Sequence, residues 1–472
     1  MNLDNIKKIY FIGIGGIGMS AAAGIARAKG FEVSGSDAAD IYQPSKGILD
    51  QFKIDYKIGY NADNFQGADL VVVTTAVDNK NPELVKAINL TVPIIGFAEL
   101  LGTLTIDKNR IVVVGTHGKG TTSGLISYAL KNLNDSGFFV GGVLNNFQTN
   151  FYFGKGKDFV LEGDEYKSTY NNSSPKFSYY FPNILLINNI EFDHPDLYPT
   201  LEAFKEPFHA LAEQMPETSL IVYNADDQNV VDVIRNTKAR KLGFGFSDFA
   251  EIKAHRIEPS NGTFKIKITW NEALLNLKED IFSTQLPGLP YAYDNLAAIA
   301  VLISIGFSAE QIKGYTESYT GIKRRYEIIE NDEIAIIDDY AHHPTAVRQT
   351  LEATRQKYPQ RRIICFFEPH TYSRTRETLD QLAKAFNSAD LVYLAEVYPA
   401  REQKLPSSIS SAEVVEKIIK NQPNVIYVKD KVDALEKFKK VVKKDDVIVV
   451  MAVGSFNTLV YDLKDAYKNL IK

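Results

Sequence analysis

The sequence predicts an α/β protein of three domains, on the basis of its length and two strand–glycine turn–helix units. The chain has 472 residues, and at roughly 100 to 200 residues per domain this length corresponds to about three domains. Apolar strands at residues 9–12 and 111–114 each run into a glycine-rich turn and a helix. Alternating strands and helices then fill roughly the last 150 residues, as in a further α/β unit. We expect domains over 1–107, 108–320 and 321–472.

Composition favours a small-molecule partner. The formal charge is −5, from 53 basic and 58 acidic residues, so we expect no nucleic-acid partner and no membrane partner. Cys365 is the only cysteine, which excludes disulfides within the chain and cysteine-based metal centres. The N-terminus has no cationic segment, and the apolar run at residues 9–19 is broken by glycines and too short to span a bilayer. We expect a cytoplasmic protein.

The first domain opens with a dinucleotide-type turn. Strand 9–12 leads into GIGGIGMS at residues 13–20, a helix to about residue 29, a strand from residue 31, and then Asp37. This pattern places a diphosphate on a helix N-terminus, but alone it leaves open a nicotinamide cofactor or another nucleotide. Asp37 either holds a ribose or caps the next turn. Strand 70–73 then ends in threonines, a helix begins near residue 82, and the polar stretch 105–110 closes the domain.

The second turn predicts a phosphate site at the start of the central domain. Residues 115–122 read GTHGKGTT, between a β-branched strand and a helical run. Glycines allow backbone N–H groups to approach phosphate oxygens, and Lys119 can reach the β and γ phosphates. The spacing differs from the ordinary Walker pattern, which would require glycine at Val113. The alternative is a plain strand–turn–helix corner without a ligand.

Two acidic clusters follow strands of the central domain. Strand 159–161 ends in EGDE at residues 162–165, and strand 184–187 ends in residues 188–196, which read NNIEFDHPD. Open α/β sheets bind ligands at these strand ends, and carboxylates there can hold Mg²⁺ beside nucleotide phosphates. Alternatively, these residues only cap turns and helices. Two clusters beside a phosphate loop favour the metal site.

The remaining chain predicts a flanking sheet and a third α/β unit. Alternating polar segments at 252–258 and 263–270 predict antiparallel strands on the flank of the central domain, before an alanine-rich helix near 295–305. In the last domain, strand 334–337 ends in DDYAHHP at residues 338–344, and strand 363–367 ends in EPHTYSRTR. Further strands are expected near 391–394, 425–428 and 447–450. His342 and His343, at a strand end beside two aspartates, are expected to line a cleft.

Five motifs together resemble the Mur ligase family of ATP-dependent amide ligases in bacterial cell-wall synthesis. The resemblance covers essentially the whole chain and rests on GIGGIGMS, GTHGKGTT, EGDE, NNIEFDH (188–194) and DDYAHHP. It implies three domains: a Rossmann-like UDP-binding domain, a P-loop ATPase-type domain with a flanking antiparallel sheet, and a C-terminal Rossmann-like domain. GIGGIGMS and DDYAHHP resemble the branch that acts on UDP-N-acetylmuramate, which removes the nicotinamide interpretation of the first turn.

The resemblance implies ATP as co-substrate, Mg²⁺ or Mn²⁺ as metal, and a role for each motif. ATP is expected at Gly115, Thr116, His117, Gly118, Lys119, Gly120, Thr121, Thr122, Arg325 and Asp339. The UDP-sugar is expected at Gly15, Gly16, Ile17, Gly18, Met19, Ser20, Asp37, Thr74 and Thr75. Thr121, Glu162 and His194 are expected to bind the metal, and Tyr340, His342 and Arg374 the amine. Catalysis is assigned to Lys119, Glu162, His194 and His343.

Three departures from the family pattern matter. Gly120 stands where this branch usually has threonine, so the metal-binding hydroxyl is expected from Thr121, as in the related folate polyglutamate ligases. The adenine-side pattern G-x-H-N-x-x-N appears at residues 288–294 as GLPYAYD, without the histidine or either asparagine. The carbamylated lysine of other branches has no counterpart, and His209 lies near its expected position.

Two amine substrates remain open. The central domain resembles that of the recycling ligase for the tripeptide L-Ala-γ-D-Glu-meso-diaminopimelate, whereas EPHTYSRTR and AEVYPARE (395–402) resemble the L-alanine-adding enzyme. We favour L-alanine, because the resemblance implies that the third domain contacts the varying substrate, and Arg374 can clamp its carboxylate. A nicotinamide oxidoreductase and a non-catalytic nucleotide-binding regulator are the alternatives of other classes. A monomer or a dimer is expected.

Overall fold

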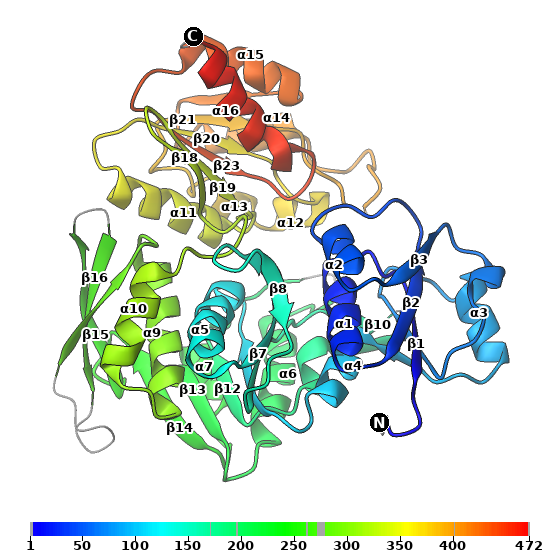
Figure 1. Ribbon diagram of the computed structural model, residues 1–472. Helices are drawn as coiled ribbons and strands as arrows, with labels where there is room; N and C mark the ends of the chain where they lie inside the picture. Colours follow the sequence, from blue (N-terminus) through cyan, green and yellow to red (C-terminus); the bar gives the residue numbers. More distant parts are fainter. Residues whose placement is uncertain are drawn as a thin grey trace. The chain divides into compact units, whose positions relative to one another are not determined.

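The computed structural model describes residues 3–169, 171–194, 197–260, 263–270, 279–400 and 402–470. Contacts divide the chain into two compact units. The first comprises residues 1–256, 267–282 and 293–319, and the second comprises residues 257–266, 283–292 and 320–472. Figure 1 gives the order of the elements along the chain. No helix of the described residues is long and apolar enough to cross a membrane.

The N-terminal part of the first unit contains a five-stranded parallel sheet in the order β3-β2-β1-β4-β5. Buried aliphatic residues form its central strands, as expected for a parallel sheet covered on both faces. Its elements are β1 (Lys8–Ile12), α1 (Ile17–Ala28), β2 (Glu32–Asp37), α2 (Ser45–Gln51), β3 (Asp55–Ile58), β4 (Leu70–Val73), α3 (Pro82–Asn89), β5 (Ile94–Gly96) and α4 (Phe97–Leu104). The sequence-based strands and helices of this region are confirmed to within a few residues.

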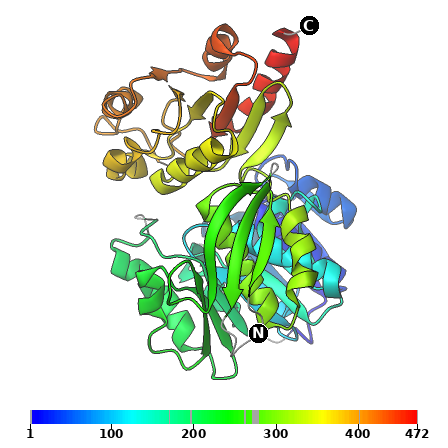
Figure 2. The same ribbon diagram turned by 90° about the vertical axis from the view of Figure 1, so that its left-hand side faces the viewer.

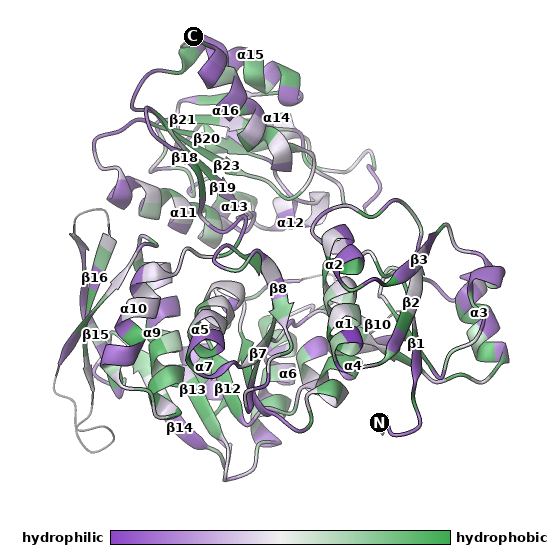
Figure 3. Cartoon of the chain, in the orientation of Figure 1, coloured by the Kyte–Doolittle hydropathy of each residue, from purple (hydrophilic) through white to green (hydrophobic). Residues whose placement is uncertain are grey.

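A ten-stranded sheet in the order β17-β16-β15-β14-β13-β12-β6-β9-β7-β8 forms the centre of the chain. Its parallel core is hydrophobic, and β12 and β13 are green in Figure 3. The core elements are β6 (Asn109–Val114), α5 (Lys119–Asn134), β9 (Asp158–Glu162), β12 (Ile184–Ile187), α6 (Leu201–Glu213), β13 (Leu220–Asn224), α7 (Gln228–Val233) and β14 (Arg240–Gly245). Two hairpins were not predicted: β7 (Gly137–Leu144) with β8 (Thr149–Tyr152), and β10 (Lys167–Thr169) with β11 (Asn172–Pro175).

The predicted flanking strands continue this sheet. β15 (Ile252–Ser260) pairs with β14 in parallel, so the flank is joined to the core and is not a separate sheet. β16 (Thr263–Trp270) lies next to β15, and β17 (Asp280–Thr284) forms the edge; Figure 2 brings this part of the sheet to the front. Helices α9 (Leu289–Ser304) and α10 (Ala309–Ser318) follow. The alanine-rich helix thus begins several residues earlier than predicted.

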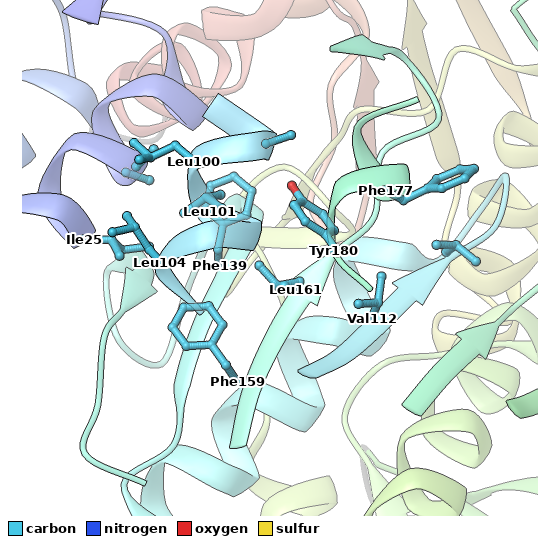
Figure 4. Packing of buried hydrophobic residues seen from close by; sticks show 14 of the residues in the cluster. Ile25, Leu100, Leu101, Leu104, Val112, Phe139, Phe159, Leu161, Phe177 and Tyr180 are labelled. Carbon is cyan, nitrogen blue, oxygen red and sulfur yellow. The ribbon is translucent and has the colours of Figure 1, made fainter. Parts of the chain in front are cut away.

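One hydrophobic cluster joins the N-terminal sheet to the central sheet within the first unit. Figure 4 shows Ile25, Leu100 and Leu104 of the N-terminal part packed with Phe139, Phe159 and other residues of the central part. A Cβ atom on Gly24 would lie 2.4 Å from the Phe151 ring, so α1 contacts β8 as closely as only glycine allows. The elements that bear the two glycine-rich turns therefore share one continuous hydrophobic core.

The second unit contains a six-stranded sheet in the order β18-β19-β23-β20-β21-β22. β18 is antiparallel to β19 and the other pairs are parallel. Hydrophobic clusters lie on both faces of the sheet. Its elements are β18 (Glu327–Asn331), β19 (Ala335–Asp339), α11 (Pro344–Lys357), β20 (Ile363–Phe367), α12 (Tyr372–Glu377), α13 (Leu379–Leu382), β21 (Leu391–Leu394), α14 (Ser411–Ile418), β22 (Val425–Tyr427), α15 (Lys431–Val441), β23 (Val447–Met451) and α16 (Leu459–Leu470). The strands predicted for this domain are confirmed.

Candidate active site

The first glycine turn is shaped by its neighbours and ends at an open helix N-terminus. Gly13 has φ +83°, and a Cβ there would lie 2.3 Å from the Thr74 side chain. The Gly15 N–H donates to Asp37 Oδ2 at 2.7 Å. Gly16 caps α1 without a side-chain hydrogen bond, so backbone N–H groups of the first helical turn are available to an anion. Asp37 therefore has a structural contact in addition to the ribose-binding role expected for it.

A buried carboxylate beneath this turn was missed by the sequence interpretation. Glu83 is fully buried and accepts hydrogen bonds from Tyr10 Oη (3.2 Å), the Asn61 N–H (3.1 Å) and Asn64 Nδ2 (2.8 Å), and from the Ser36 hydroxyl. The Ser36 carbonyl accepts the N–H groups of residues 13 and 14 in the glycine turn. The N-P-E sequence at residues 81–83 indicated only a helix start, which Asn81 indeed caps.

The second turn requires glycine at two positions. Gly115 has φ +136°, and a Cβ there would lie 2.9 Å from the Asn189 carbonyl. Gly118 has φ +77° and is the N-cap residue of α5, and a Cβ there would lie 2.1 Å from Asp294 Oδ1. The turn therefore packs closely against the segment that follows β12 and against α9. Asp294 stands at the last asparagine of the expected adenine-side pattern.

The hydroxyl groups of this loop differ in their partners. Thr116 Oγ1 donates to the Glu191 carbonyl at 2.9 Å, and Ser123 Oγ donates to the Lys119 carbonyl at 2.7 Å. Thr122 Oγ1 donates to Asp294 Oδ1 at 3.1 Å and accepts from Asn188 Nδ2 at 3.0 Å. Hydrogen bonds among the described residues engage these three hydroxyls but not that of Thr121, whose carbonyl accepts from Tyr319.

Lys119 belongs to a buried charge cluster with Glu165 and His194. Its Nζ lies 2.9 Å from Glu165 Oε2 and donates to the Gly115 carbonyl at 2.6 Å. Burial by itself lowers the pKa of Lys119, but the Glu165 carboxylate outweighs burial, and the net pKa lies above the ordinary lysine value. His194 Nε2 lies 3.2 Å from Glu165 Oε1. Glu165 thus connects Lys119, the lysine predicted to bind phosphate, to His194, the predicted metal ligand.

Residues of both acidic clusters lie near this group, and their role as metal ligands stays a prediction. Glu162 accepts the Gly141 N–H at 2.6 Å and is close enough to Lys119 to raise its pKa. His194 follows β12 and has φ +55°, a conformation that is uncommon outside glycine. Glu191 of the second cluster contacts the phosphate loop, where its Oε2 lies 2.9 Å from His117 Nε2. Residues 195–196 of the NNIEFDHPD stretch lie outside the described residues.

The second unit brings its predicted residues to the ends of β19 and β20. Asp339 is buried and accepts the N–H groups of Tyr326 (2.8 Å) and Ala341 (2.7 Å). Burial raises the pKa of Asp339, and the Arg325 guanidinium counteracts it. The Arg325 guanidinium carbon lies 5.0 Å from the centre of the Tyr340 ring, which places the predicted ATP and amine residues of this unit side by side.

A histidine pair connects the two strand ends of this unit. The His342 and His370 rings are 5.2 Å apart, and His342 also contacts the Tyr340 ring at 5.4 Å. Arg374 Nη1 lies 3.2 Å from His370 Nδ1, so the arginine is oriented by a histidine that was not singled out from the sequence. His343 is buried as the N-cap residue of α11. Tyr340, His342 and Arg374 are therefore linked through the His370 ring, and their role in binding the amine stays a prediction.

Besides Glu83, the structure places Glu165, Asp294 and His370 next to predicted site residues, and none of the three was predicted. Glu165 and His370 lay inside motifs quoted from the sequence, EGDE and EPHTYSRTR. Their position after an apolar strand was the available signal, but it did not distinguish them from their neighbours. Asp294 was visible only as a departure from the adenine-side pattern, whose first five residues belong to the second unit.

Family comparisons cover nearly the whole chain. Residues 8–109 match the Mur ligase family catalytic domain, residues 113–302 the Mur ligase middle domain, and residues 324–454 the Mur ligase glutamate ligase domain. The UDP-N-acetylmuramate–L-alanine ligase of Sulfurihydrogenibium sp. (strain YO3AOP1) is 35% identical over 96% of both chains. That of Acetivibrio thermocellus is 38% identical over 96% of this chain and 94% of its own.

Solved structures agree with these matches. The UDP-N-acetylmuramate-alanine ligase MurC of Thermotoga maritima gives a TM-score of 0.79 at 26% identity, covering 98% of this chain and 99% of that chain. The murein peptide ligase mpl of Psychrobacter arcticus gives 0.70 at 26% identity with the same coverage. The sequence identity to relatives over nearly full length, with the site geometry above, shows that this chain belongs to the Mur ligase family.

Proposed function

We propose that this protein joins the lactyl carboxylate of UDP-N-acetylmuramate to L-alanine, with ATP hydrolysed to ADP and phosphate, in peptidoglycan precursor synthesis. The observation that carries this proposal is the set of relatives 33–38% identical over at least 96% of the chain, each a UDP-N-acetylmuramate–L-alanine ligase. The higher TM-score with the alanine ligase than with the murein peptide ligase supports it. We also propose a cytoplasmic location, because ATP is a co-substrate.

The reaction runs through an acyl phosphate. The substrate carboxylate attacks the γ-phosphorus of ATP and ADP leaves; the amine then attacks the acyl carbon, and phosphate departs as the amide forms. Phosphoryl transfer depends on positioning and charge neutralisation. Lys119 supplies a buried positive charge for the β and γ phosphates, and Glu165 keeps that lysine protonated and fixed. The open N-terminus of α1 is suited to the UDP diphosphate.

Thr121, Glu162 and His194 are proposed to hold Mg²⁺ or Mn²⁺. Two of the three donors, the Thr121 hydroxyl and the Glu162 carboxylate, fit Mg²⁺, because it prefers oxygen ligands and retains several waters beside nucleotide phosphates. Among the loop threonines, Thr121 is the one whose hydroxyl makes no hydrogen bond to the described residues. When bound, the metal supplies charge neutralisation for the phosphate oxygens.

Tyr340, His342 and Arg374 are proposed to receive the amine substrate. Arg374 can hold a carboxylate in a bidentate pair, and His370 orients it. The recycling reaction with L-Ala-γ-D-Glu-meso-diaminopimelate is the second candidate. It is favoured by the EGDEYKSTYNN and NNIEFDHPDLYP segments of the central domain and by the similarity to the murein peptide ligase.

Phosphate release from ATP in the presence of UDP-N-acetylmuramate tests the proposal. L-Alanine, L-serine, glycine and the tripeptide should be compared at equal concentration, with product mass measured in each case. We expect turnover with L-alanine and much less with the other amines. Turnover with the tripeptide alone would replace the amine assignment, and no release with any amine would favour a nucleotide-binding regulator.

A further inference from the structure

The second unit holds two adjacent arginines and two adjacent aspartates beside one tyrosine ring. Arg325 and Asp339, whose charges interact, are expected to contact ATP. Arg324 and Asp338, the adjacent residues, form an ion pair without an assigned role. The guanidinium carbons of Arg324 and Arg325 lie 5.2 Å and 5.0 Å from the centre of the Tyr340 ring. The position of this ring therefore depends on both arginines.

Strand alternation separates the two aspartates. Asp338 follows Ile336 on the face of β19 that packs against α16, whereas Asp339 lies on the α11 face. Asp338 is 1% exposed, and its Oδ2 lies 3.3 Å from Arg324 Nε. Its Oδ1 is buried without a hydrogen-bond partner among the described residues. Arg324 is therefore the cationic partner on which the ionised Asp338 depends.

Arg324 is fixed by contacts from several strand ends. Its carbonyl accepts the Tyr340 N–H at 2.8 Å, and its own N–H donates to Glu327 Oε2 at 2.8 Å. Its Nη2 donates to the carbonyl of Ala452, which follows β23. Glu327 lies opposite Asp338 in the β18–β19 register, so Arg324 contacts two acidic residues, Glu327 through its backbone N–H and Asp338 through its guanidinium.

We propose that Arg324 and Asp338 act as a positioning pair that holds the Tyr340 ring in place for the amine substrate while Asp338 is ionised. The proposal rests on the proposed function, since it takes Tyr340 as a residue of the amine site. Neither residue is given a contact with the substrate. Their effect is transmitted through the backbone hydrogen bond and the ring contact that Arg324 makes to Tyr340.

The pair is expected to titrate near neutral pH. Burial raises the pKa of Asp338 to about 7 against the opposing effect of Arg324, and Asp339 and Glu327 raise it further. Tyr461 of α16 is a further titratable group whose charge interacts with that of Asp338. Below this pH the carboxyl group is neutral and its attraction for Arg324 weakens. The Michaelis constant for L-alanine should therefore increase as the pH falls through about 7.

Asp338→Asn is the test variant because it removes the charge and preserves the shape. At pH 8 we expect its KM for L-alanine to rise about tenfold, with kcat and the KM for UDP-N-acetylmuramate within twofold of the native values. The ratio of its L-alanine KM to that of the native protein should fall toward one between pH 8 and 6, because protonation of the substrate amine affects both proteins alike. Asp446→Asn is the matched control, since Asp446 is a buried partner of Arg362 at the opposite ends of the strands.

A second readout does not depend on turnover. The Tyr340 ring resonance of tyrosine-labelled protein, assigned with Tyr340→Phe, should shift with a midpoint near pH 7 in the native protein and not in Asp338→Asn. A shift that persists in Asp338→Asn would identify His342 as its source and overturn the proposal. An unchanged L-alanine KM in Asp338→Asn, or an equal rise in Asp446→Asn, would also overturn it. Absence of all ligase activity with the expected ring titration would instead overturn the proposed function.

Discussion

Replacing the two adjacent threonines of the phosphate loop separates a chemical role from a structural one. Thr121 is 6% exposed and its hydroxyl makes none of the hydrogen bonds among the described residues, so Thr121→Ala removes about one buried methyl group, worth roughly 0.8 kcal/mol. Thr122→Ala also removes the hydrogen bonds of its hydroxyl to Asp294 and Asn188, worth about 1.5–3 kcal/mol for the carboxylate and about 0.5–1.5 kcal/mol for the amide. We expect losses of unfolding free energy of about 1 kcal/mol and about 3–5 kcal/mol respectively.

The two substitutions should affect turnover in the reverse order, with the larger loss in Thr121→Ala. If Thr121 holds the metal beside the transferring phosphoryl group, Thr121→Ala should lower kcat on the order of 100-fold or more, as removal of one preorganised contact does. Folded Thr122→Ala should retain more activity, and Gly120→Thr should be tolerated. Urea unfolding and phosphate release measure the two effects separately. A stable, fully active Thr121→Ala enzyme would refute the placement of the metal-binding hydroxyl.

Three further variants test the packing around the two turns. Glu165→Gln should lower the pKa of Lys119. Activity should then be lost at a lower pH on the alkaline side than in the native enzyme. An unchanged alkaline limb of the pH–rate profile would contradict the pairing. Gly118→Ala should raise the KM for ATP about tenfold or more, because a Cβ would lie 2.1 Å from Asp294; a native KM would contradict this geometry. Glu83→Gln should lower the free energy of unfolding by about 2–4 kcal/mol, measured with urea. It should also weaken UDP-sugar binding, measured by calorimetry. Native stability would exclude the role of Glu83 under the turn.

The parallel strands were predictable because their sequences are almost continuously apolar. Residues 184–187, 363–367 and 391–394 match the observed strands residue for residue. The short hairpin β10–β11 was not predictable, because its residues KST and NSSP have no alternating apolar pattern. Its place in the fold depends on contacts with distant parts of the chain.

Within the site, sequence motifs identified strand ends but not the partners of each side chain. Lys119 was expected to contact phosphate from its place in the glycine turn, whereas its pairing with Glu165 depends on how two strands lie side by side. His370 similarly reaches Arg374 through one turn of chain that begins with strained backbone at Thr371, where φ is +60°. Local sequence carries no direct signal for either contact.

The amine requirement for phosphate release tests the central claim most directly. With ATP, Mg²⁺ and UDP-N-acetylmuramate present, the account predicts that L-alanine starts phosphate release and gives a product heavier than the UDP-sugar by one alanine residue. Release that starts only with L-Ala-γ-D-Glu-meso-diaminopimelate, or no release with any amine, would contradict it.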